Sequence, residues 1–162
     1  MSSNLILSGR FYYSYSQFMV FDRSVKLPGC AWTDAHFLQG FARRDQNVCF
    51  GTLSEFGHAD LNVYLAPYET RDEYERVVEV PLKVLSTEIA ISGPEEYPEK
   101  YVAQVTAGDY RLVSAQATVR EDLETIDLYL ERLAFPLAGS RIIVADGALR
   151  PPSPLLETAE VA

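Results

Sequence analysis

The stretch YYSYSQFMVFD (residues 12–22), followed by RSVKLPGCA (23–31), WTDAHFLQGFARRD (32–45) and QNVCFGTL (46–53), predicts a strand, a loop, a helix and a second strand. Its first segment is rich in aromatic residues, which favour a pleated and largely buried setting over a helix. Apolar side chains fall on both faces of this segment, a pattern typical of a central strand. We expect the rest of the chain to pack around it.

The helix is predicted by local signals at its start. Thr33 is placed to be the N-cap, and Trp32 and Phe37 flank it at the positions of a hydrophobic staple. Asp34 in the first turn and the arginines at 43–44 in the last turn would complement the helix dipole. Apolar pairs four residues apart would give the helix one apolar face: Phe37 with Phe41, and Leu38 with Ala42. On this interpretation Trp32 is a core anchor.

Composition indicates one acidic domain. The chain has 162 residues, of which 48% are hydrophobic, and 23 acidic residues against 14 basic ones give a net charge of −9. Such a chain is a poor binder of nucleic acid or anionic membranes and suits a basic partner. The start, MSSNLILSGRF, lacks a basic n-region and a long apolar run, so neither a signal peptide nor a membrane span is expected. Cys30 and Cys49 are expected to be reduced and partly buried, with one disulfide as the alternative.

Alternation with a period of two continues along the chain. We predict further strands at residues 58–66, 74–84, 88–92, 101–106, 110–119, 126–131 and 141–145. The turn at residues 106–109 would join two of them as a hairpin, and Pro81 would place its strand at a sheet edge or a bulge. The fold class expected is therefore mainly β: an antiparallel β-sandwich of about nine short strands with one amphipathic helix. Residues 1–148 would form the domain and the proline-rich residues 149–162 a mobile tail.

Acidic residues concentrate in two places. Residues 69–99 contain nine acidic residues and three basic ones, and a second group follows at Glu121, Asp122 and Glu124. Several of these residues lie in predicted loops, which could present them to a partner. The alternative interpretation is a solvated surface that protects an edge strand by its charge.

Catalytic motifs are absent from the sequence, which has no glycine-rich phosphate loop and no GxSxG, HExxH or CxxC pattern. His58 and Asp60 resemble half of a metal site, but His36 is the only other histidine, so ordinary polar positions are expected. Glu95 and Glu96 could be read as an acid/base pair, although neighbouring carboxylates in a loop are usually solvated. We therefore do not expect an enzyme, and we expect no metal or cofactor.

Several short strings of the sequence are distinctive when taken in order: YSQFMVF (15–21), WTD (32–34), GFA (40–42), YE (74–75), VP (80–81) and GDY (108–110) followed by Leu112. Together they resemble the competence protein J family, whose members are also described as inhibitors of the DNA-entry nuclease. They occur in the family's order over about residues 12–135. The resemblance implies a binding protein that blocks a metal-dependent DNA nuclease of the DNA-uptake or toxin type.

The charge and the resemblance together predict the partner and the site. The partner would be a nuclease with a basic active-site groove, bound without direct contact to nucleic acid and without membrane insertion. The loops at residues 67–72 and 93–100 would carry the site, with an exposed tyrosine as anchor and carboxylates as a rim. The candidate partner-binding residues are Tyr68, Glu69, Asp72, Glu73, Tyr74, Glu95, Glu96, Tyr97 and Glu99. A cytoplasmic location is expected, with membrane association only through the partner, and the oligomeric state is left open.

Two other classes of function remain open at this point. A β-sandwich that binds a small molecule or carbohydrate would show a concave aromatic patch. A structural or assembly module would use an edge strand to add strands from a neighbour.

Overall fold

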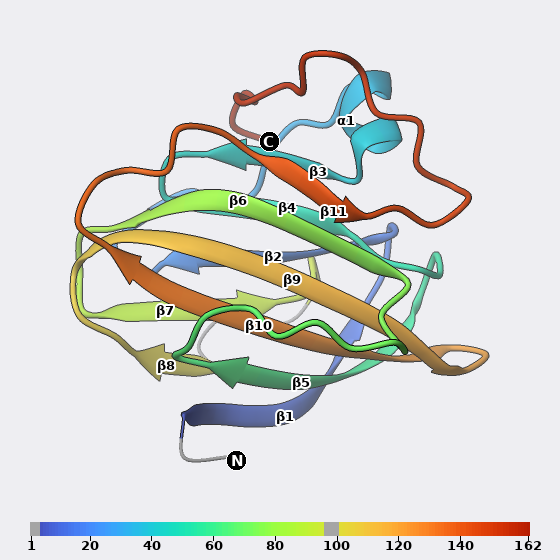
Figure 1. Cartoon of the computed structure of the whole chain (residues 1–162), viewed down its shortest axis with the longest axis horizontal. Helices are drawn as coiled ribbons and strands as arrows, with labels where there is room; N and C mark the ends of the chain where they lie inside the picture. Colours follow the sequence, from blue (N-terminus) through green and yellow to red (C-terminus); the bar gives the residue numbers. More distant parts are fainter. Residues whose placement is uncertain (1–3, 96–100) are drawn as a thin grey trace.

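Two β-sheets stack against each other in the computed structural model, which describes residues 4–95 and 101–162 (Figure 1). The described residues contain one helix, α1 (Asp34–Gln39), and eleven strands. The strands are β1 (Leu5–Tyr13), β2 (Gln17–Asp22), β3 (Phe41–Arg44), β4 (Asn47–Gly51), β5 (Gly57–Tyr64), β6 (Arg76–Val84), β7 (Glu88–Ser92), β8 (Val102–Gln104), β9 (Gly108–Arg120), β10 (Leu123–Leu133) and β11 (Arg141–Val144). The predicted mainly β sandwich with a single helix is therefore confirmed.

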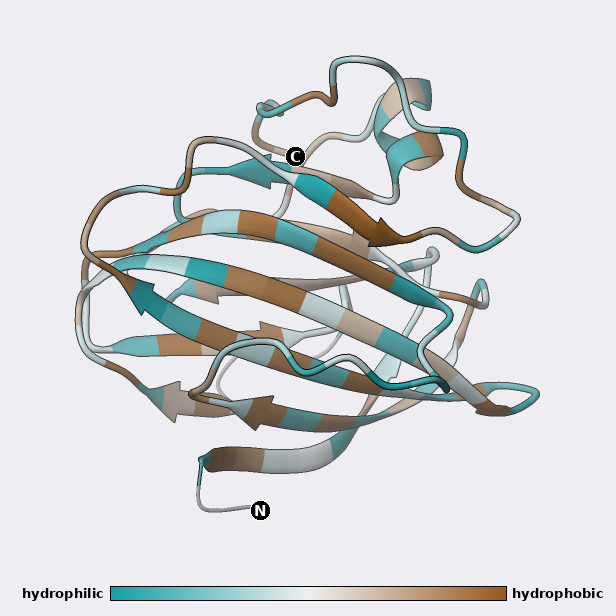
Figure 2. Cartoon of the chain, viewed as in Figure 1, coloured by the Kyte–Doolittle hydropathy of each residue, from teal (hydrophilic) through white to brown (hydrophobic). Residues whose placement is uncertain are grey.

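The two sheets differ in size and pairing. The larger has the order β1-β5-β10-β9-β6-β11 and contains one parallel pair, β5 with β10. The smaller has the order β3-β4-β2-β7-β8 and is antiparallel throughout. Apolar side chains alternate with polar ones along β9 and β10 (Figure 2), and the inward-facing residues of both sheets form one core.

The strand predicted for residues 12–22 is in fact two strands in different sheets. β1 ends at Tyr13 and β2 begins at Gln17, and the turn between them carries φ 57° at both Tyr15 and Ser16. The prediction of a single strand was wrong because this turn has neither glycine nor proline, the usual sequence signals of a turn. The prediction of a central strand holds for β2, which lies between β4 and β7.

The helix begins as predicted but ends early. Thr33 is the N-cap, and the rings of Trp32 and Phe37 stack with centroids 4.9 Å apart. The helix stops after Gln39 because Gly40 adopts φ 86°, a left-handed cap that glycine allows at little cost. Residues 41–44, which were expected to complete the helix, form strand β3. Trp32 is half-buried and packs with Ala42 and Cys49 on the outer face of the smaller sheet, so it is not in the main core.

The hairpin predicted around residues 106–109 does not form. β8 pairs with β7 in the smaller sheet, whereas β9 pairs with β6 and β10 in the larger one. The chain between them crosses from one sheet to the other, and the hairpin partner of β9 is β10. At Pro81 the edge prediction holds locally, because β11 pairs only with residues 77–79 of β6.

Residues 137–162, which we call the C-terminal segment, first add β11 to the edge of the larger sheet beside β6 and then pass α1 at the top of Figure 1. The Gln39 side chain donates to the Leu156 carbonyl at 3.0 Å and accepts from its N–H at 2.8 Å. Arg76 forms a bidentate ion pair with Asp146, at 2.8 and 3.0 Å. Leu149 is buried. The mobile tail expected for residues 149–162 stays a prediction, and these contacts argue against it.

Candidate partner-binding surface

The loop between β5 and β6 crosses the outer face of the larger sheet and is fixed there by tyrosines. The Tyr68 ring lies edge-on to Tyr129, with centroids 5.5 Å apart. The Tyr74 hydroxyl is 2.6 Å from that of Tyr129 and donates to a carboxylate oxygen of Asp127 at 2.5 Å. Burial and the bond to Asp127 raise the pKa of Tyr74. These rings hold the loop on the sheet.

The expectation that Tyr68 and Tyr74 are exposed anchors is therefore corrected. Tyr74 is only 6% exposed, and Tyr68 is half-buried with its hydroxyl turned inward. Both tyrosines contact Tyr129 of β10, more than fifty residues later in the chain, and local sequence does not reveal such a contact. The sequence signal available was the high density of tyrosines in the chain, which suits a packed aromatic cluster as well as an interface.

The carboxylates of the same loop remain available. Glu69, Asp72 and Glu73 are exposed, and their side chains make no hydrogen bond or ion pair with any residue that the structure describes. Arg71, between them, extends toward Asp127, with its Nη1 atom 3.9 Å from a carboxylate oxygen. The loop thus presents acidic groups from a fixed backbone.

The second predicted loop is described only up to Glu95. Glu95 is exposed and accepts a hydrogen bond from the Ser14 hydroxyl. Glu96, Tyr97 and Glu99 lie outside the described residues.

Backbone contacts gather several connections at one end of the sandwich. The Ser16 N–H donates to the Glu55 carbonyl at 2.8 Å, and the His58 N–H donates to the Asp122 carbonyl at 2.8 Å. These contacts and the Ser14–Glu95 bond define a surface that we call the loop end: residues 14–16, 52–56, 93–95 and 118–122. The β1–β2, β4–β5 and β9–β10 connections lie at the right-hand end in Figure 1. Sequence reasoning missed this assembly because its parts are far apart in the chain.

Glu124, one of the acidic residues of the second group, is not part of this surface. It is buried and accepts hydrogen bonds from the Tyr13 hydroxyl at 2.9 Å, the Leu53 N–H at 3.0 Å and the Gln116 amide at 2.9 Å. Burial raises the pKa of Glu124, and these bonds oppose the shift. Its role is to join β1, β9, β10 and the loop that precedes β5.

The residues considered as metal ligands or reactive thiols do not form such a site. Asp60 pairs with Arg10 at 2.6 Å, which leaves His58 without a carboxylate partner in the described structure. Across residues 4–95 and 101–162, no three His, Cys, Asp or Glu side chains are grouped as metal ligands would be. Cys30 and Cys49 are buried and not bridged, and a hydrogen bond with Cys30 together with burial raises the pKa of Cys49.

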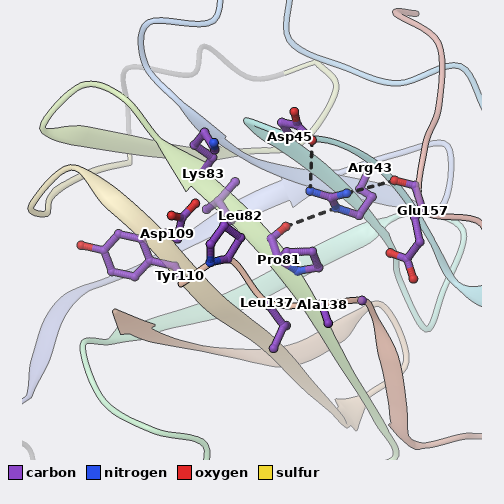
Figure 3. A pocket seen from close by; sticks show the side chains of 12 residues that line it. Arg43, Asp45, Pro81, Leu82, Lys83, Asp109, Tyr110, Leu137, Ala138 and Glu157 are labelled. Atoms are coloured by element: carbon purple, nitrogen blue, oxygen red, sulfur yellow. Dashed lines mark hydrogen bonds and ion pairs between the residues drawn. The ribbon is translucent and has the colours of Figure 1, made fainter. Parts of the chain in front are cut away.

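A hollow of about 200 Å³ lies where Arg43 meets the C-terminal segment (Figure 3). The Arg43 guanidinium donates to the Pro81 carbonyl at 3.2 Å and to the Glu157 carbonyl at 2.9 Å, so its donors are used within the protein. Tyr110 is the aromatic residue at the wall, and its ring is buried. This hollow is smaller than typical ligand pockets of about 300–1,000 Å³ and offers no aromatic platform for a sugar.

The fold and surface define a small acidic β-sandwich protein. The family model described as Competence protein J (ComJ) matches residues 10–136, and the chain belongs to this family. The match confirms the resemblance seen over residues 12–135. It ends before the C-terminal segment.

Two solved structures are similar. One is titled as the crystal structure of ComJ, inhibitor of the DNA degrading activity of NucA, from Bacillus subtilis; it has a TM-score of 0.69 and 24% identity, covering 80% of this chain and 97% of that chain. At this identity the similarity shows the fold. The other, titled crocagin biosynthetic gene J, has a TM-score of 0.49 and 13% identity over 76% of this chain and 96% of that chain. No curated protein matches the sequence.

No helix among the described residues is long and apolar enough to cross a membrane.

Proposed function

We propose that this chain is a protein inhibitor of a DNA nuclease, acting by binding and not by catalysis. The observation that carries the proposal is the ComJ family match over residues 10–136. The similar fold of the Bacillus subtilis protein titled as inhibitor of NucA supports it. The target is a metal-dependent nuclease of the DNA-uptake or toxin type, and the cytoplasm is the proposed location, with membrane contact only through that partner.

The mechanism is occupation of the nuclease's basic groove by acidic side chains. A nuclease presents positive charge to DNA phosphates, and an acidic protein of complementary shape excludes DNA from the same surface. The exposed carboxylates of Glu69, Asp72 and Glu73 have no internal partner among the described residues, which leaves them free to pair with cationic side chains of the nuclease. The net charge of −9 disfavours direct binding of this chain to DNA.

Of the other two classes of function, carbohydrate or small-molecule binding receives no support from the hollow at Arg43. The assembly module remains an outcome that the experiment below can reveal, as a concentration-dependent oligomer without any effect on a nuclease.

Titration against the NucA-like nuclease of the same organism tests the proposal. We expect near-stoichiometric suppression of DNA hydrolysis, and no hydrolysis by the chain alone with any divalent metal. Raising magnesium or manganese should not restore nuclease activity, because the inhibitor blocks a groove and does not chelate the metal. An unrelated protein of similar net charge is the control. Recovery by extra metal alone would contradict the mechanism.

A further inference from the structure

The loop end carries two exposed aromatic residues that the fold itself does not use. We propose that Tyr15 and Phe56 are the apolar anchors by which this chain docks on a basic partner surface, the groove of the inhibited nuclease. The inference rests on the proposed function and assigns it a place on the molecule: the end of the sandwich, with the loop at residues 67–73 as an outlying acidic rim.

Tyr15 combines an unfavourable backbone conformation with an exposed aromatic side chain. Its φ of 57°, repeated at Ser16, lies in the left-handed region, which costs most residues about 1–2 kcal/mol relative to the right-handed one. Its side chain is 69% exposed, so packing within the chain does not repay this cost. The Gln17 N–H closes the turn on the Ser14 carbonyl at 3.3 Å. A strained residue held outward by its surroundings points to a role in recognition.

Phe56 belongs to the loop that is bonded to this turn. Its side chain is 59% exposed. The Ser16 N–H donates to the Glu55 carbonyl, and the Thr52 N–H donates to the Ser16 carbonyl at 2.9 Å. These two backbone hydrogen bonds place Tyr15 and Phe56 on neighbouring loops of the loop end.

Within the loop end, the β4–β5 connection is held in place where it meets the β9–β10 turn. A Cβ atom on Gly57 would lie 2.5 Å from the Asp122 carbonyl oxygen, so the two backbones are in close contact there. The buried Glu124 carboxylate bonds Leu53 of the same loop to Tyr13 of β1. Preorganised loops lose little conformational entropy when a partner binds, which is a requirement for tight docking.

The charge around the aromatic residues selects the partner. The exposed carboxylates at this end belong to Glu55, Glu95, Glu121 and Asp122, and Arg120 is the exposed arginine among them. Aromatic residues surrounded by carboxylates match a partner with a basic, partly apolar surface. They disfavour a second copy of this chain, since two acidic loop ends would repel each other.

The orientation of the side chains distinguishes the apolar anchors at the loop end from the charged rim at residues 67–73. At the loop of residues 67–73 Tyr68 packs against the sheet, and three carboxylates and one arginine are exposed, so that loop contributes net negative steering charge. At the loop end the aromatic rings face outward. Truncating central anchors speeds dissociation, whereas neutralising rim charges slows association. The loop end is therefore where substitutions should change the lifetime of the complex.

Binding kinetics with the catalytically inactivated NucA-like nuclease of the same organism test the proposal. The variants are Tyr15→Asn, in which asparagine tolerates the left-handed backbone, and Phe56→Ala. The matched control is Phe135→Ala, which removes an 80% exposed aromatic ring beyond the far end of β10. We expect each anchor variant to dissociate about 30-fold faster, the effect of losing a hot-spot residue, and the control to behave as the parent. Tyr15→Asn should be at least as stable as the parent, because asparagine tolerates the left-handed backbone, and Phe56→Ala and Phe135→Ala should unfold as the parent does.

The outcomes separate this inference from the function on which it rests. Unchanged lifetimes in both anchor variants, with the parent still binding, would overturn the docking surface and leave the inhibitor function standing. Absence of any complex with the parent would overturn both. A concentration-dependent dimer of the parent that the anchor substitutions abolish would identify a second copy as the occupant and overturn the assignment of the partner.

Discussion

Polar side chains beneath the C-terminal segment are buried and hydrogen-bonded within the protein, whereas many of those at the loop end are exposed to solvent. Gln39, Arg43 and Arg76 are buried, and each donates to a carbonyl or carboxylate. Glu55 and Glu121 at the loop end are exposed, and their side chains have no partner among the described residues. The first group therefore determines stability, whereas the second is free to interact with another molecule. Four variants, three single and one triple, test this division between buried and exposed polar side chains, from the largest expected effect to the smallest.

Arg76→Ala should cause the largest loss of stability. Arg76 and Asp146 expose only 6% and 22% of their side chains, and removing the cation leaves the carboxylate half-buried without its partner. We expect the free energy of unfolding to fall by about 3–5 kcal/mol, measured by urea denaturation. The control is Arg10→Ala, which breaks a pair with Asp60 that is 53% and 40% exposed and should cost less than about 1 kcal/mol. Equal losses in both variants would contradict the distinction between buried and exposed pairs.

Gln39→Ala should come next. It removes two hydrogen bonds to Leu156 and one to the Phe41 carbonyl, and leaves these backbone groups without partners. A loss of about 2–4 kcal/mol is expected, together with faster hydrogen exchange at the Leu156 amide. Gln104→Ala, on the exposed side of β8, is the matched control and should stay within about 0.5 kcal/mol of the parent. If Leu156 already exchanges freely in the parent, the C-terminal segment is mobile as the sequence suggested.

Asp22→Asn should destabilise the protein in a pH-dependent manner. Although burial opposes it, hydrogen bonds from the Ser86 hydroxyl and from backbone N–H groups lower the pKa of Asp22 below its ordinary value of 3.8. This stabilisation is present above the unfolded pKa and is lost as the pH falls through the folded pKa. We expect a deficit of about 1–3 kcal/mol at pH 5–7 that shrinks below about pH 4. A loss of stability that does not vary between pH 7 and pH 3 would contradict the role of the ionised Asp22 carboxylate. The control is Asp72→Asn, at an exposed position.

Neutralising Glu69, Asp72 and Glu73 together, as Gln, Asn and Gln, should barely affect stability. These exposed carboxylates have no internal partner in the described structure, so the unfolding free energy should change by less than about 0.5 kcal/mol. Association with the nuclease should become slower and less dependent on salt, because steering charge is lost. Neutralisation of Asp45 and Glu160, exposed elsewhere, is the control. Association rates equal to the parent at low and high salt would show that these carboxylates are only solvated surface.

Most errors in the predicted elements involve long-range contacts or unusual turns; the exception is the end of the helix, where Gly40 was a local signal. The left-handed turn at Tyr15 and Ser16 divides a segment that reads as one strand. β8 and β9 are adjacent in sequence but lie in different sheets, and Tyr74 is buried because it meets Asp127 and Tyr129 from a distant strand. Periodicity reports which faces of a strand are apolar, and it does not report which neighbour covers them.

The sequence by itself determined the mainly β class, the start of α1 at Thr33 with the Trp32–Phe37 staple, the acidic charge and the family. These features depend on period, local caps and composition, which act over a few residues. The tertiary structure alone decided which aromatic side chains are buried and which loops meet, because both depend on the pairing of strands far apart in the chain. For that reason Tyr68 and Tyr74, selected from the sequence as exposed anchors, pack against the outer face of the larger sheet, and Tyr15 and Phe56 are the exposed aromatic residues of the loop end.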